Sequence, residues 1–338
     1  MTVTVGVVAN PASGRDIRRL VTSASVFDNA EKANMIVRLM TGLGAAGVTR
    51  VLMMPTAASI VANVERRLRG GAGDLLPRLD YLDMPVEESA ADTVLATRLL
   101  RAAGVAGIAV LGGDGTHRLV ARHCGDVPLL ALSTGTNNAF PRMGETTVGG
   151  LAFGLACSGR VPPEVACVRH PALAVDRGGR RDHEYALVDV AVSADPFVGS
   201  RAIWRPEEIG EICVSRADPA AVGLSAVAGL LGPAGVGVHV RLAPVESAGT
   251  VLTVALAPGL AVPVGVRSFS LLRPGDEVPL APGEGCIALD GEREIERRAG
   301  ERFAVRLVEG PRTVEVPAVM RYAAAHGLLR AGTEVVCP

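Results

Sequence analysis

Residues 1–145 alternate short apolar runs with longer stretches in which apolar side chains recur with helical spacing. A short apolar run is typical of a buried strand, and the longer spacing is typical of an amphipathic helix. The predicted strands are residues 3–9, 48–54, 79–84, 107–111 and 127–132, and the predicted helices are residues 29–43, 57–68, 87–103 and 117–123. Strands separated by helices of this length pair in parallel through right-handed crossovers, so this part is predicted to be a doubly wound α/β domain.

The pattern changes in the second half of the chain. Residues 148–158 predict a helix rich in small residues, and beyond it short apolar runs lie between Gly and Pro turns. These runs are residues 173–175, 185–192, 237–242, 250–256, 303–307 and 313–316, and a last amphipathic helix is expected at about 318–329. Short strands of this kind are typical of a sandwich-like β domain. The sequence therefore predicts a Rossmann-like domain at 1–147, a helical connector at 148–164, a β-rich domain at 165–316 and a C-terminal helix and tail at 317–338.

Composition supports two packed domains and argues against several kinds of partner. Hydrophobic residues make up 49% of the chain and charged residues 20%, which leaves enough apolar surface for two cores. The formal net charge is −1, with 34 basic and 35 acidic residues interspersed, so no nucleic-acid or membrane partner is expected. Only 3% of the residues are aromatic, too few for base-stacking platforms.

Cysteine use and the N-terminus indicate a cytoplasmic protein. The six cysteines are scattered without a Cys-x-x-Cys pair, which favours reduced thiols over disulfides or a zinc site. The first residues lack the basic region and long apolar run of a signal peptide. Residues 219–240 are uncharged and long enough to span a membrane, but their glycines and prolines favour a buried, glycine-rich segment.

The strongest chemical signal follows the predicted strand 107–111. Residues 112–116, Gly-Gly-Asp-Gly-Thr, lead from this strand into a helix, and their glycines permit positive φ and let backbone N–H groups approach phosphate oxygens. Asp114 would repel a phosphate, so its expected work is to accept a proton from an attacking hydroxyl or to hold Mg²⁺. The alternative is a tight turn without chemistry, because a chain with 40 glycines has many such turns.

Two further polar turns follow predicted strands of the same sheet. Residues 10–14, Asn-Pro-Ala-Ser-Gly, follow the first strand, and residues 133–138, Ser-Thr-Gly-Thr-Asn-Asn, follow the fifth. Asn and Thr also favour turns for local hydrogen-bonding reasons, so neither turn is specific alone. The carboxyl ends of parallel strands meet at one edge, however, and ligands bind at that edge in open α/β sheets. Three polar turns at one edge therefore predict a binding site.

Three other chemistries are not favoured. Residues 42–47 match Gly-x-Gly-x-x-Gly, but they close a predicted helix and precede a strand, whereas the dinucleotide motif must follow a strand and open a helix. Lys32 is the only lysine and lies in an ordinary-looking predicted helix. Neither a Walker-type phosphate loop nor Schiff-base chemistry is therefore expected.

Taken together, the three turns resemble the superfamily of NAD kinases, diacylglycerol kinases and sphingosine kinases. Near the C-terminus, residues 289–292, Leu-Asp-Gly-Glu, resemble the Asp-Gly-Glu or Asp-Gly-Gln element of these enzymes, and the motifs occur in the family's order over most of the chain. The overall likeness is closest to the ATP-NAD kinase-like acetoin catabolism protein X branch. The resemblance implies a Rossmann-like nucleotide-binding domain, a β-rich acceptor domain and an ATP site in the cleft between them.

The resemblance also implies roles for individual positions. Asp114 would be the general base or the group that orients the acceptor, and Glu292 would be a second catalytic residue at the reacting phosphoryl group. Asp290 would hold the metal, although Asp-Gly is also a strong hairpin signal. The residues expected to contact the nucleotide and its phosphates are Asn10, Ser13, Gly112, Gly113, Gly115, Thr116, Thr136, Asn137 and Asn138. The expected cofactors are ATP and Mg²⁺.

Departures from the family concern the phosphoryl acceptor, which is expected to be a small molecule. Where NAD kinases carry an Asn-Glu or Asn-Asp pair, this chain has Val188 and Asp189, and we expect Asp189 either to bind the acceptor or to face outward from a strand. Residues 223–228 stand in place of the family's Gly-Ser-Thr-Ala-Tyr element. NAD is the acceptor expected first. The alternatives are another polyol, cofactor or lipid, or an inactive nucleotide-binding regulator, and a homo-oligomer is expected.

Overall fold

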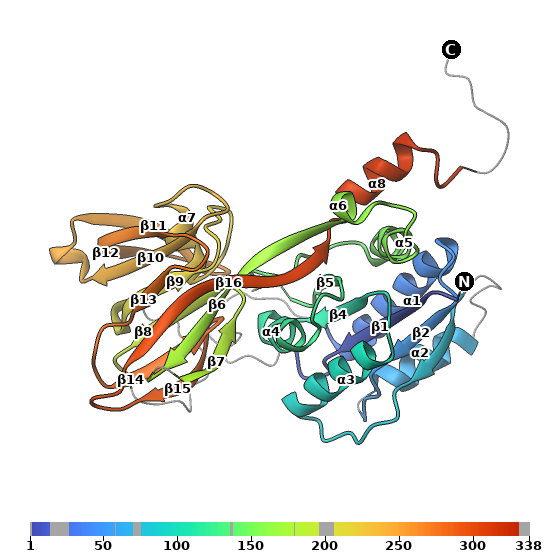
Figure 1. The fold of residues 1–338 in the computed structure, drawn as a ribbon, viewed down its shortest axis with the longest axis horizontal. Coiled ribbons are helices and arrows are strands. Elements are labelled where there is room, and N and C mark those ends of the chain that lie inside the picture. Colours follow the sequence, from blue (N-terminus) through green and yellow to red (C-terminus); the bar gives the residue numbers. More distant parts are fainter. Residues whose placement is uncertain are drawn as a thin grey trace, which may run out of the picture.

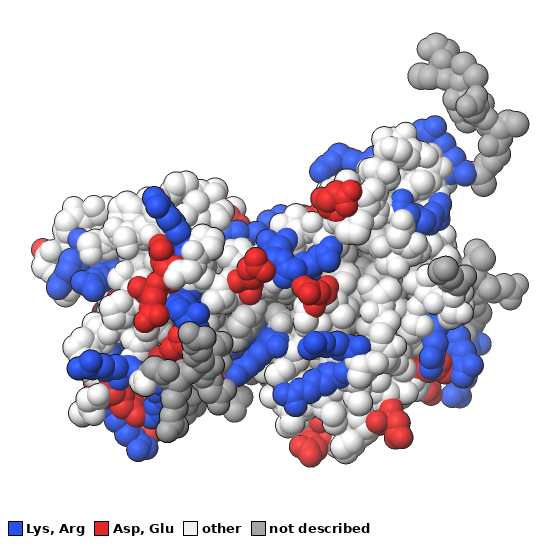
Figure 2. Space-filling model, viewed as in Figure 1, with Lys and Arg blue, Asp and Glu red and all other residues white. Residues whose placement is uncertain are grey.

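The computed structural model describes residues 2–13, 27–57, 59–69, 76–135, 138–178, 180–195 and 206–330. Two lobes are joined by two long strands, β6 (Cys167–Arg177) and β16 (Phe303–Val314), which run from one lobe into the other (Figure 1). On the face that Figure 2 shows, both lobes carry basic and acidic side chains. On this face the charges are mixed, as they are along the sequence.

The N-terminal lobe contains the doubly wound sheet that the sequence predicts. Its parallel strands lie in the order β3-β2-β1-β4-β5. They are β1 (Thr4–Ala9), β2 (Arg50–Met53), β3 (Arg78–Tyr81), β4 (Ile108–Gly112) and β5 (Leu129–Ser133), and the helices are α1 (Asn29–Ala45), α2 (Ile60–Arg69), α3 (Ala90–Ala102), α4 (Asp114–His123) and α5 (Thr146–Cys157). Val7 packs with α1, α2 and α5, whereas Val8 packs with α3 and α4. Helices therefore cover both faces of the sheet, which explains why its strands are almost wholly apolar.

The same sheet continues beyond β5 with strands from the second half of the chain. β16 pairs with β5 in parallel and with β6 antiparallel, and β7 (Arg180–Ala186) lies at the edge beside β6, while the short β13 (Glu277–Pro279) also pairs with β16. The prediction of two strands at 303–307 and 313–316 is wrong, because β16 is one strand with a register shift between Glu309 and Arg312. Gly310 and Pro311 bend the strand there without ending it, since proline removes only one ladder donor.

The second sheet is antiparallel and lies in the C-terminal lobe. Its order is β11-β12-β10-β9-β8-β14-β15. These strands are β8 (Asp189–Ser193), β9 (Ile209–Val214), β10 (Gly237–Ala243), β11 (Thr250–Ala257), β12 (Leu260–Leu272), β14 (Gly285–Leu289) and β15 (Glu292–Arg297). Side chains of β8 and β14 share one core with side chains of β6, β7 and β16. The two sheets therefore pack face to face, which confirms the predicted β-rich, sandwich-like domain. The predicted domain limits stay a prediction, because β6 and β16 belong to both lobes.

The predicted strand 185–192 is divided in the structure. β7 ends at Ala186 in the first sheet, and β8 begins at Asp189 in the second. Between them, the N–H groups of Leu187 and Val188 donate to the carboxylate of Asp290 instead of to a neighbouring strand. Residues on both sides of this break are buried, so the sequence stays apolar across it and does not reveal the division.

The remaining helices are short. They are α6 (Pro163–Ala166), η2 (Pro206–Glu208), α7 (Leu224–Gly229), η3 (Val245–Ser247) and α8 (Val316–Ala325). α7 lies inside the uncharged segment 219–240, and all of its residues are buried, as expected for a glycine-rich packed segment. Among the described residues, no helix has the length and apolar character needed to cross a membrane.

The Gly-x-Gly-x-x-Gly match at residues 42–47 belongs to a contact between two helices. α1 ends at Ala45, inside the matched segment. A Cβ on Gly42 would lie 2.1 Å from the carbonyl oxygen of Thr147 in α5, and Gly150 of α5 makes the reciprocal close approach to α1. The missing side chains let the two helix backbones touch, so Gly42 serves packing.

Replacing Gly42 with alanine is expected to lower the free energy of unfolding by about 1–3 kcal/mol or more, because the added methyl group overpacks this contact. Gly44, which lies inside the same helix, is the matched control. Gly44→Ala should change stability by at most about 1 kcal/mol, since alanine favours a helix. Urea denaturation measures both values. A loss of ATP affinity of about tenfold in Gly44→Ala would instead favour a dinucleotide motif.

Candidate active site

Three polar turns meet at the carboxyl edge of the parallel sheet, as the sequence predicts. Asn10 Nδ2 donates a hydrogen bond of 2.9 Å to Thr116 Oγ1, which joins the turn after β1 to the first turn of α4. Ser13 Oγ and Thr134 Oγ1 lie 3.1 Å apart and join the turn after β1 to the turn after β5. Asn10, Ser13 and Thr116, which are expected to bind nucleotide, thus take part with Thr134 in cross-linking the three turns.

Lys32 organises the turn after β1, a role that the sequence analysis missed. Its side chain is 1% exposed, and Nζ donates to the carbonyl oxygens of Asn10, Pro11 and Ser13 at 3.0–3.3 Å. A charged ammonium on three carbonyls fixes the conformation of this turn. The sequence carried one signal for this role: Lys32 lies next to Ala33, on the apolar and buried face of α1.

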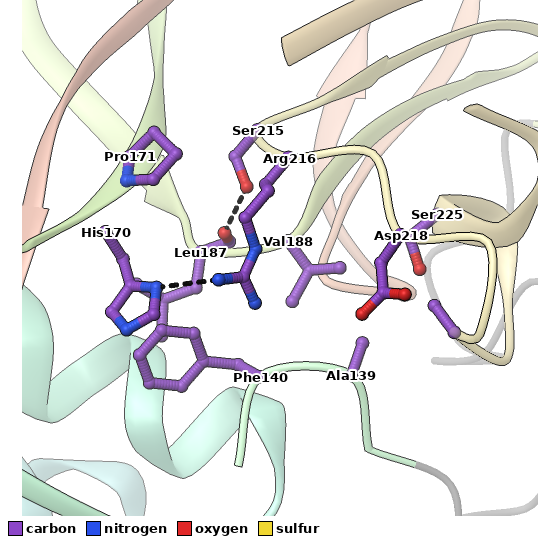
Figure 3. Close-up of a pocket in the computed structure, with 11 residues that line it drawn as sticks. Ala139, Phe140, His170, Pro171, Leu187, Val188, Ser215, Arg216, Asp218 and Ser225 are labelled. Atoms are coloured by element: carbon purple, nitrogen blue, oxygen red, sulfur yellow. Dashed lines mark hydrogen bonds between the residues drawn. The ribbon is translucent and has the colours of Figure 1, made fainter. Parts of the chain in front are cut away.

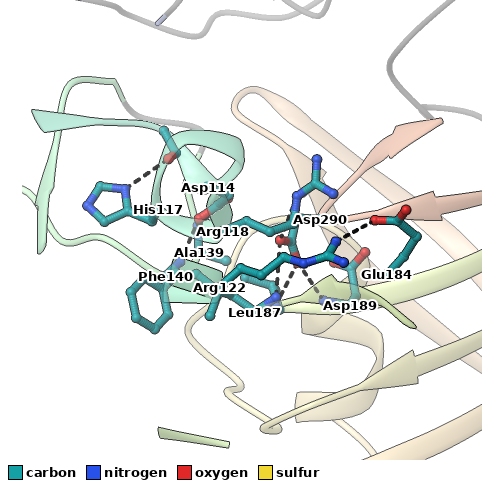
Figure 4. Close-up of polar contacts among 12 residues, drawn as sticks. Asp114, His117, Arg118, Arg122, Ala139, Phe140, Glu184, Leu187, Asp189 and Asp290 are labelled. Carbon is teal, nitrogen blue, oxygen red and sulfur yellow. Dashed lines mark hydrogen bonds and ion pairs between the residues drawn. The ribbon is translucent and has the colours of Figure 1, made fainter. Parts of the chain in front are cut away.

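Asp114 is the first residue of α4, and the loop after β5 holds its carboxylate. Oδ1 accepts a hydrogen bond of 2.8 Å from Phe140 N–H, and Oδ2 accepts one of 3.0 Å from Ala139 N–H (Figure 4). The positive end of the α4 dipole lies at the same position. The loop and the helix together orient this carboxylate and favour its negative charge.

Asn138 ties the loop after β5 to Asp114. Its Oδ1 accepts a hydrogen bond of 3.3 Å from Asp114 N–H, and its Nδ2 donates one of 2.8 Å to Ser133 Oγ. The predicted nucleotide contacts of Thr136 and Asn137 lie outside the described residues. Asn138 thus fixes the shape of the loop, and its contact with a nucleotide stays a prediction.

The glycines of the Gly-Gly-Asp-Gly-Thr segment serve close approach. None of them uses the positive φ that glycine permits, since Gly113 has a φ of −94° and neither Gly112 nor Gly115 lies in the left-handed region. α4 begins at Asp114, so the turn is also shorter than predicted. A Cβ on Gly112 would lie 2.6 Å from the Thr116 side chain, and one on Gly113 would lie 2.9 Å from the Asn138 side chain. The glycines leave room for the polar side chains of the neighbouring turns.

The β14–β15 hairpin carries a carboxylate from the C-terminal lobe to the start of α4. Asp290 and Gly291 have φ values of 53° and 78°, which form the tight two-residue turn that Asp-Gly favours. Glu292 follows, and its Oε1 lies 3.4 Å from the position of a Cβ on Gly115. Asp-Gly is therefore a hairpin turn, and this turn also brings Glu292 to the helix that begins with Asp114.

Asp290 is fully buried and anchors the crossing from β7 to β8. Oδ1 accepts the Val188 N–H at 2.7 Å, Oδ2 accepts the Leu187 N–H at 3.1 Å, and Arg118 Nε lies 3.7 Å from Oδ2. Burial raises the pKa of Asp290 to about 6, with a further contribution from the charge of Asp114, against the opposing effect of Arg118 and these N–H groups. Figure 4 shows Arg118 reaching from α4 to Asp290.

The predicted metal role of Asp290 stays a prediction. Both of its oxygens accept backbone N–H groups, and the described residues contain no group of three or more His, Cys, Asp or Glu side chains placed to hold a metal ion. Asp189 begins β8 beside Asp290 and is buried, so the expectation of an outward-facing Asp189 is wrong. The role of Asp189 in acceptor binding stays a prediction as well.

A pocket lies between the two lobes beside Asp114 (Figure 3). It encloses about 380 Å³ of space, part of it open to solvent. The residues that line it are Ala139, Phe140, His170, Pro171, Leu187, Val188, Ser215, Arg216, Asp218, Ala221 and Ser225. Ala139 and Phe140 are the residues whose N–H groups hold Asp114, so the pocket and the carboxylate share one wall.

His170 is a neutral support for Arg216 in this pocket. Arg216 Nη1 lies 3.2 Å from His170 Nδ1, and His170 Nε2 lies 2.6 Å from Thr313 Oγ1. Arginine can only donate, so Nδ1 accepts and Nε2 carries the proton that is donated to Thr313. Burial, together with Arg216 and Arg142, lowers the pKa of His170 to about 4. No sequence motif marked His170 or Arg216, because both lie in segments without a turn signature.

Phe140 is held between two histidines. Its ring centroid lies 5.9 Å from that of His117 and 5.4 Å from that of His170. His117 is buried, which lowers its pKa to about 4, and its Nδ1 donates to the Gly113 carbonyl oxygen at 2.9 Å. This packing fixes the backbone that orients Asp114.

Comparison with known proteins agrees with this fold. Residues 5–154 match the ATP-NAD kinase N-terminal domain, and residues 171–310 match the acetoin catabolism protein X C-terminal domain. The crystal structure of yeast NADH kinase complexed with NADH aligns over 99% of this chain and 90% of that chain, with a TM-score of 0.51 and 13% identity. The chain therefore has the NAD kinase fold.

A curated relative defines the family more closely. Acetoin catabolism protein X of Cupriavidus necator is 43% identical over 336 residues, which cover 96% of this chain and 94% of that protein. The chain belongs to the acetoin catabolism protein X family.

Proposed function

We propose that the protein is a cytoplasmic phosphotransferase that moves the γ-phosphoryl group of ATP to a hydroxyl of a small molecule. The observation that carries this proposal is the Asp114 carboxylate, which is oriented by the same Ala139 and Phe140 backbone that lines the pocket. A carboxylate at this position can accept the proton of an attacking hydroxyl, or orient that hydroxyl toward the phosphoryl group.

The cross-linked turns are the proposed nucleotide side of the site. The N–H groups at the start of α4 and the hydroxyl of Thr116, whose oxygen accepts from Asn10, are donors suited to phosphate oxygens, and the helix dipole favours the same charge. Lys32 lies beneath this edge and holds the turn after β1 in place.

Mg²⁺ fits the residues at the start of α4. Asp114 and Glu292 supply carboxylate oxygens, the ligand type that Mg²⁺ prefers, and one or two carboxylates with substrate phosphates are its usual set. When bound, Mg²⁺ would neutralise charge on the transferred phosphoryl group. We assign the metal to these two residues in preference to Asp290, because the side chain of Asp290 is fully buried and paired with Arg118.

NAD is the named acceptor to test first, and it is expected to be a poor one. Val188 places an apolar side chain in the pocket wall where NAD kinases have an amide, and residues 223–228 replace a polar family element. Each buried polar group of NAD left unpaired costs about 1–3 kcal/mol. A coupled assay for NADP formation should therefore give a kcat/KM below about 10⁴ M⁻¹s⁻¹. A higher value would make NAD kinase the preferred activity.

A nucleotide-binding regulator is the second candidate, because two backbone N–H groups on Asp114 would also suit a purely structural aspartate. Single-turnover ATP consumption with a panel of hydroxyl compounds separates the two functions. ATP binding without acceptor-dependent consumption would favour the regulator.

A further inference from the structure

We propose that the pocket beside Asp114 binds an acceptor that carries an anionic group, a carboxylate or a phosphate, held by Arg216, and a hydroxyl group that Ser225 binds. The role of the bound molecule as acceptor rests on the proposed kinase function, whereas the anion site rests on the pocket alone. Two independent features of the pocket support it.

Arg216 is the first feature. Figure 3 shows its guanidinium inside the pocket, where one nitrogen is bound to His170. Within the described ranges of the chain, no carboxylate lies at ion-pair distance from Arg216. Its partner is a neutral imidazole, so the positive charge is oriented without being neutralised. A guanidinium keeps further N–H donors for a planar carboxylate or a phosphate, which it binds with two hydrogen bonds.

Ser225 is the second feature. It lines the pocket and is 2% exposed, and its Oγ has no hydrogen-bond partner among the described residues. A buried hydroxyl without a partner is unfavourable, and native structures rarely keep one without a reason. A ligand oxygen in the pocket supplies the missing partner.

The other lining residues restrict where the anion can lie. Val188 lies between Arg216 and Asp218 in Figure 3, so the pocket has a basic side and an acidic side. Asp218 repels an anion, and its Oδ1 already accepts the Ala220 N–H at 2.9 Å. Leu187, Val188 and Phe140 form an apolar wall. By excluding water, this wall strengthens the electrostatic attraction between Arg216 and an anion. The anion therefore lies on the Arg216 side, and hydroxyls of the same molecule lie toward Asp218 and Ser225, which are neighbours in Figure 3.

The anion site is close enough to Asp114 to serve one small acceptor. The Phe140 ring contacts His170, which supports Arg216, while the Phe140 N–H binds the Asp114 carboxylate. A single residue thus separates the two ends, so one small molecule can span them.

Four probes distinguish the sources of such an anion. D-glycerate and glycerol differ by one carboxylate, glycerol 3-phosphate carries a phosphate, and NAD carries a diphosphate. Binding of each to the full-length protein without ATP is measured by calorimetry and thermal shift, and acceptor-dependent ATP consumption is measured separately. We expect glycerate or glycerol 3-phosphate to bind at millimolar concentrations and glycerol not to bind.

Two variants and one control test the residues. Arg216→Gln should weaken anion binding by about tenfold or more, since it removes a charge-assisted contact. Ser225→Ala should weaken binding too, yet raise the melting temperature of the free protein, because it removes an unpaired buried hydroxyl. Arg169→Gln is the control, since Arg169 lies beside His170 on β6 but is ion-paired to Asp126 and does not line the pocket.

The outcomes separate the two proposals. Anion binding that depends on Arg216, without ATP consumption, supports the anion site and contradicts the kinase function. ATP consumption that is indifferent to Arg216→Gln supports the kinase and overturns the anion site. Binding of NAD alone, with the same dependence on Arg216, supports the site and assigns the anion to a dinucleotide diphosphate. Equal binding of glycerate and glycerol, or no binding of any probe, overturns the proposal.

Discussion

Replacing Asp114 with asparagine is expected to lower phosphoryl-transfer turnover by about a hundredfold or more, the usual scale for losing general-base assistance. The amide carries no charge and cannot accept the proton of the acceptor hydroxyl at neutral pH. Its one oxygen can still accept the Phe140 N–H, so the loop and the ATP site should persist. Steady-state turnover at saturating acceptor, together with calorimetric ATP affinity, measures both parts of the prediction.

Asp92 offers a matched control for the structural part of this effect. Asp92 is buried, whereas Asp114 is half-buried, and both oxygens of Asp92 accept the N–H of Glu87, which precedes α3, at 3.0 and 3.2 Å. Asp92→Asn should cost stability without a specific loss of turnover. Near-normal turnover in Asp114→Asn, or an equal loss in the two variants, would reduce the role of Asp114 to holding the loop.

Replacing Asp290 with alanine is expected to lower the free energy of unfolding by about 3–5 kcal/mol, the scale for removing one partner of a buried charge pair. The change leaves the N–H groups of Leu187 and Val188 without an acceptor and takes a carboxylate away from Arg118. It also places alanine at a φ of 53°, which aspartate and asparagine tolerate better. Urea denaturation followed by circular dichroism measures the loss.

Asp276→Ala is the control for this prediction. Asp276 also accepts a backbone N–H in a turn, from Arg273 at 2.7 Å, but it is exposed. Its loss should cost only about 0.5–1.5 kcal/mol, the net worth of an ordinary hydrogen bond. Equal losses in the two variants would show that burial of Asp290 adds nothing.

Because the pKa of Asp290 is raised, the contribution of Asp290 to the free energy of unfolding depends on pH. The folded-state pKa is about 6 and the ordinary value is 3.8, so the folded protein binds the proton more tightly than the unfolded chain. The stability that this tighter proton binding contributes is fully present below pH 3.8 and is lost as the pH rises to about 6. The stability of the wild-type protein relative to the non-titrating Asp290→Asn variant should therefore fall between these pH values. A constant difference would mean that Asp290 titrates alike in both states.

The sequence by itself determined the α/β character of the N-terminal lobe and the three turns that build the candidate site. Apolar spacing is a local property, and glycine and asparagine turns act within a few residues, so both can be recognised without tertiary contacts. Right-handed parallel connections then place the ends of β1, β4 and β5 at one edge. For this reason the contact between Asn10 and Thr116 follows from the order of the strands.

Only the tertiary structure decided which distant residues complete the site. Lys32 became the support of the turn after β1 because the apolar face of α1 is buried there. The break at Leu187 is set by the carboxylate of Asp290, from a hairpin far along the chain. Arg216 and Ser225 meet the wall beside Asp114 because β16 pairs with β5 and β6 and so ties the second lobe to the first. An apolar run has the same pattern in either sheet, so no local signal could reveal these long-range pairings.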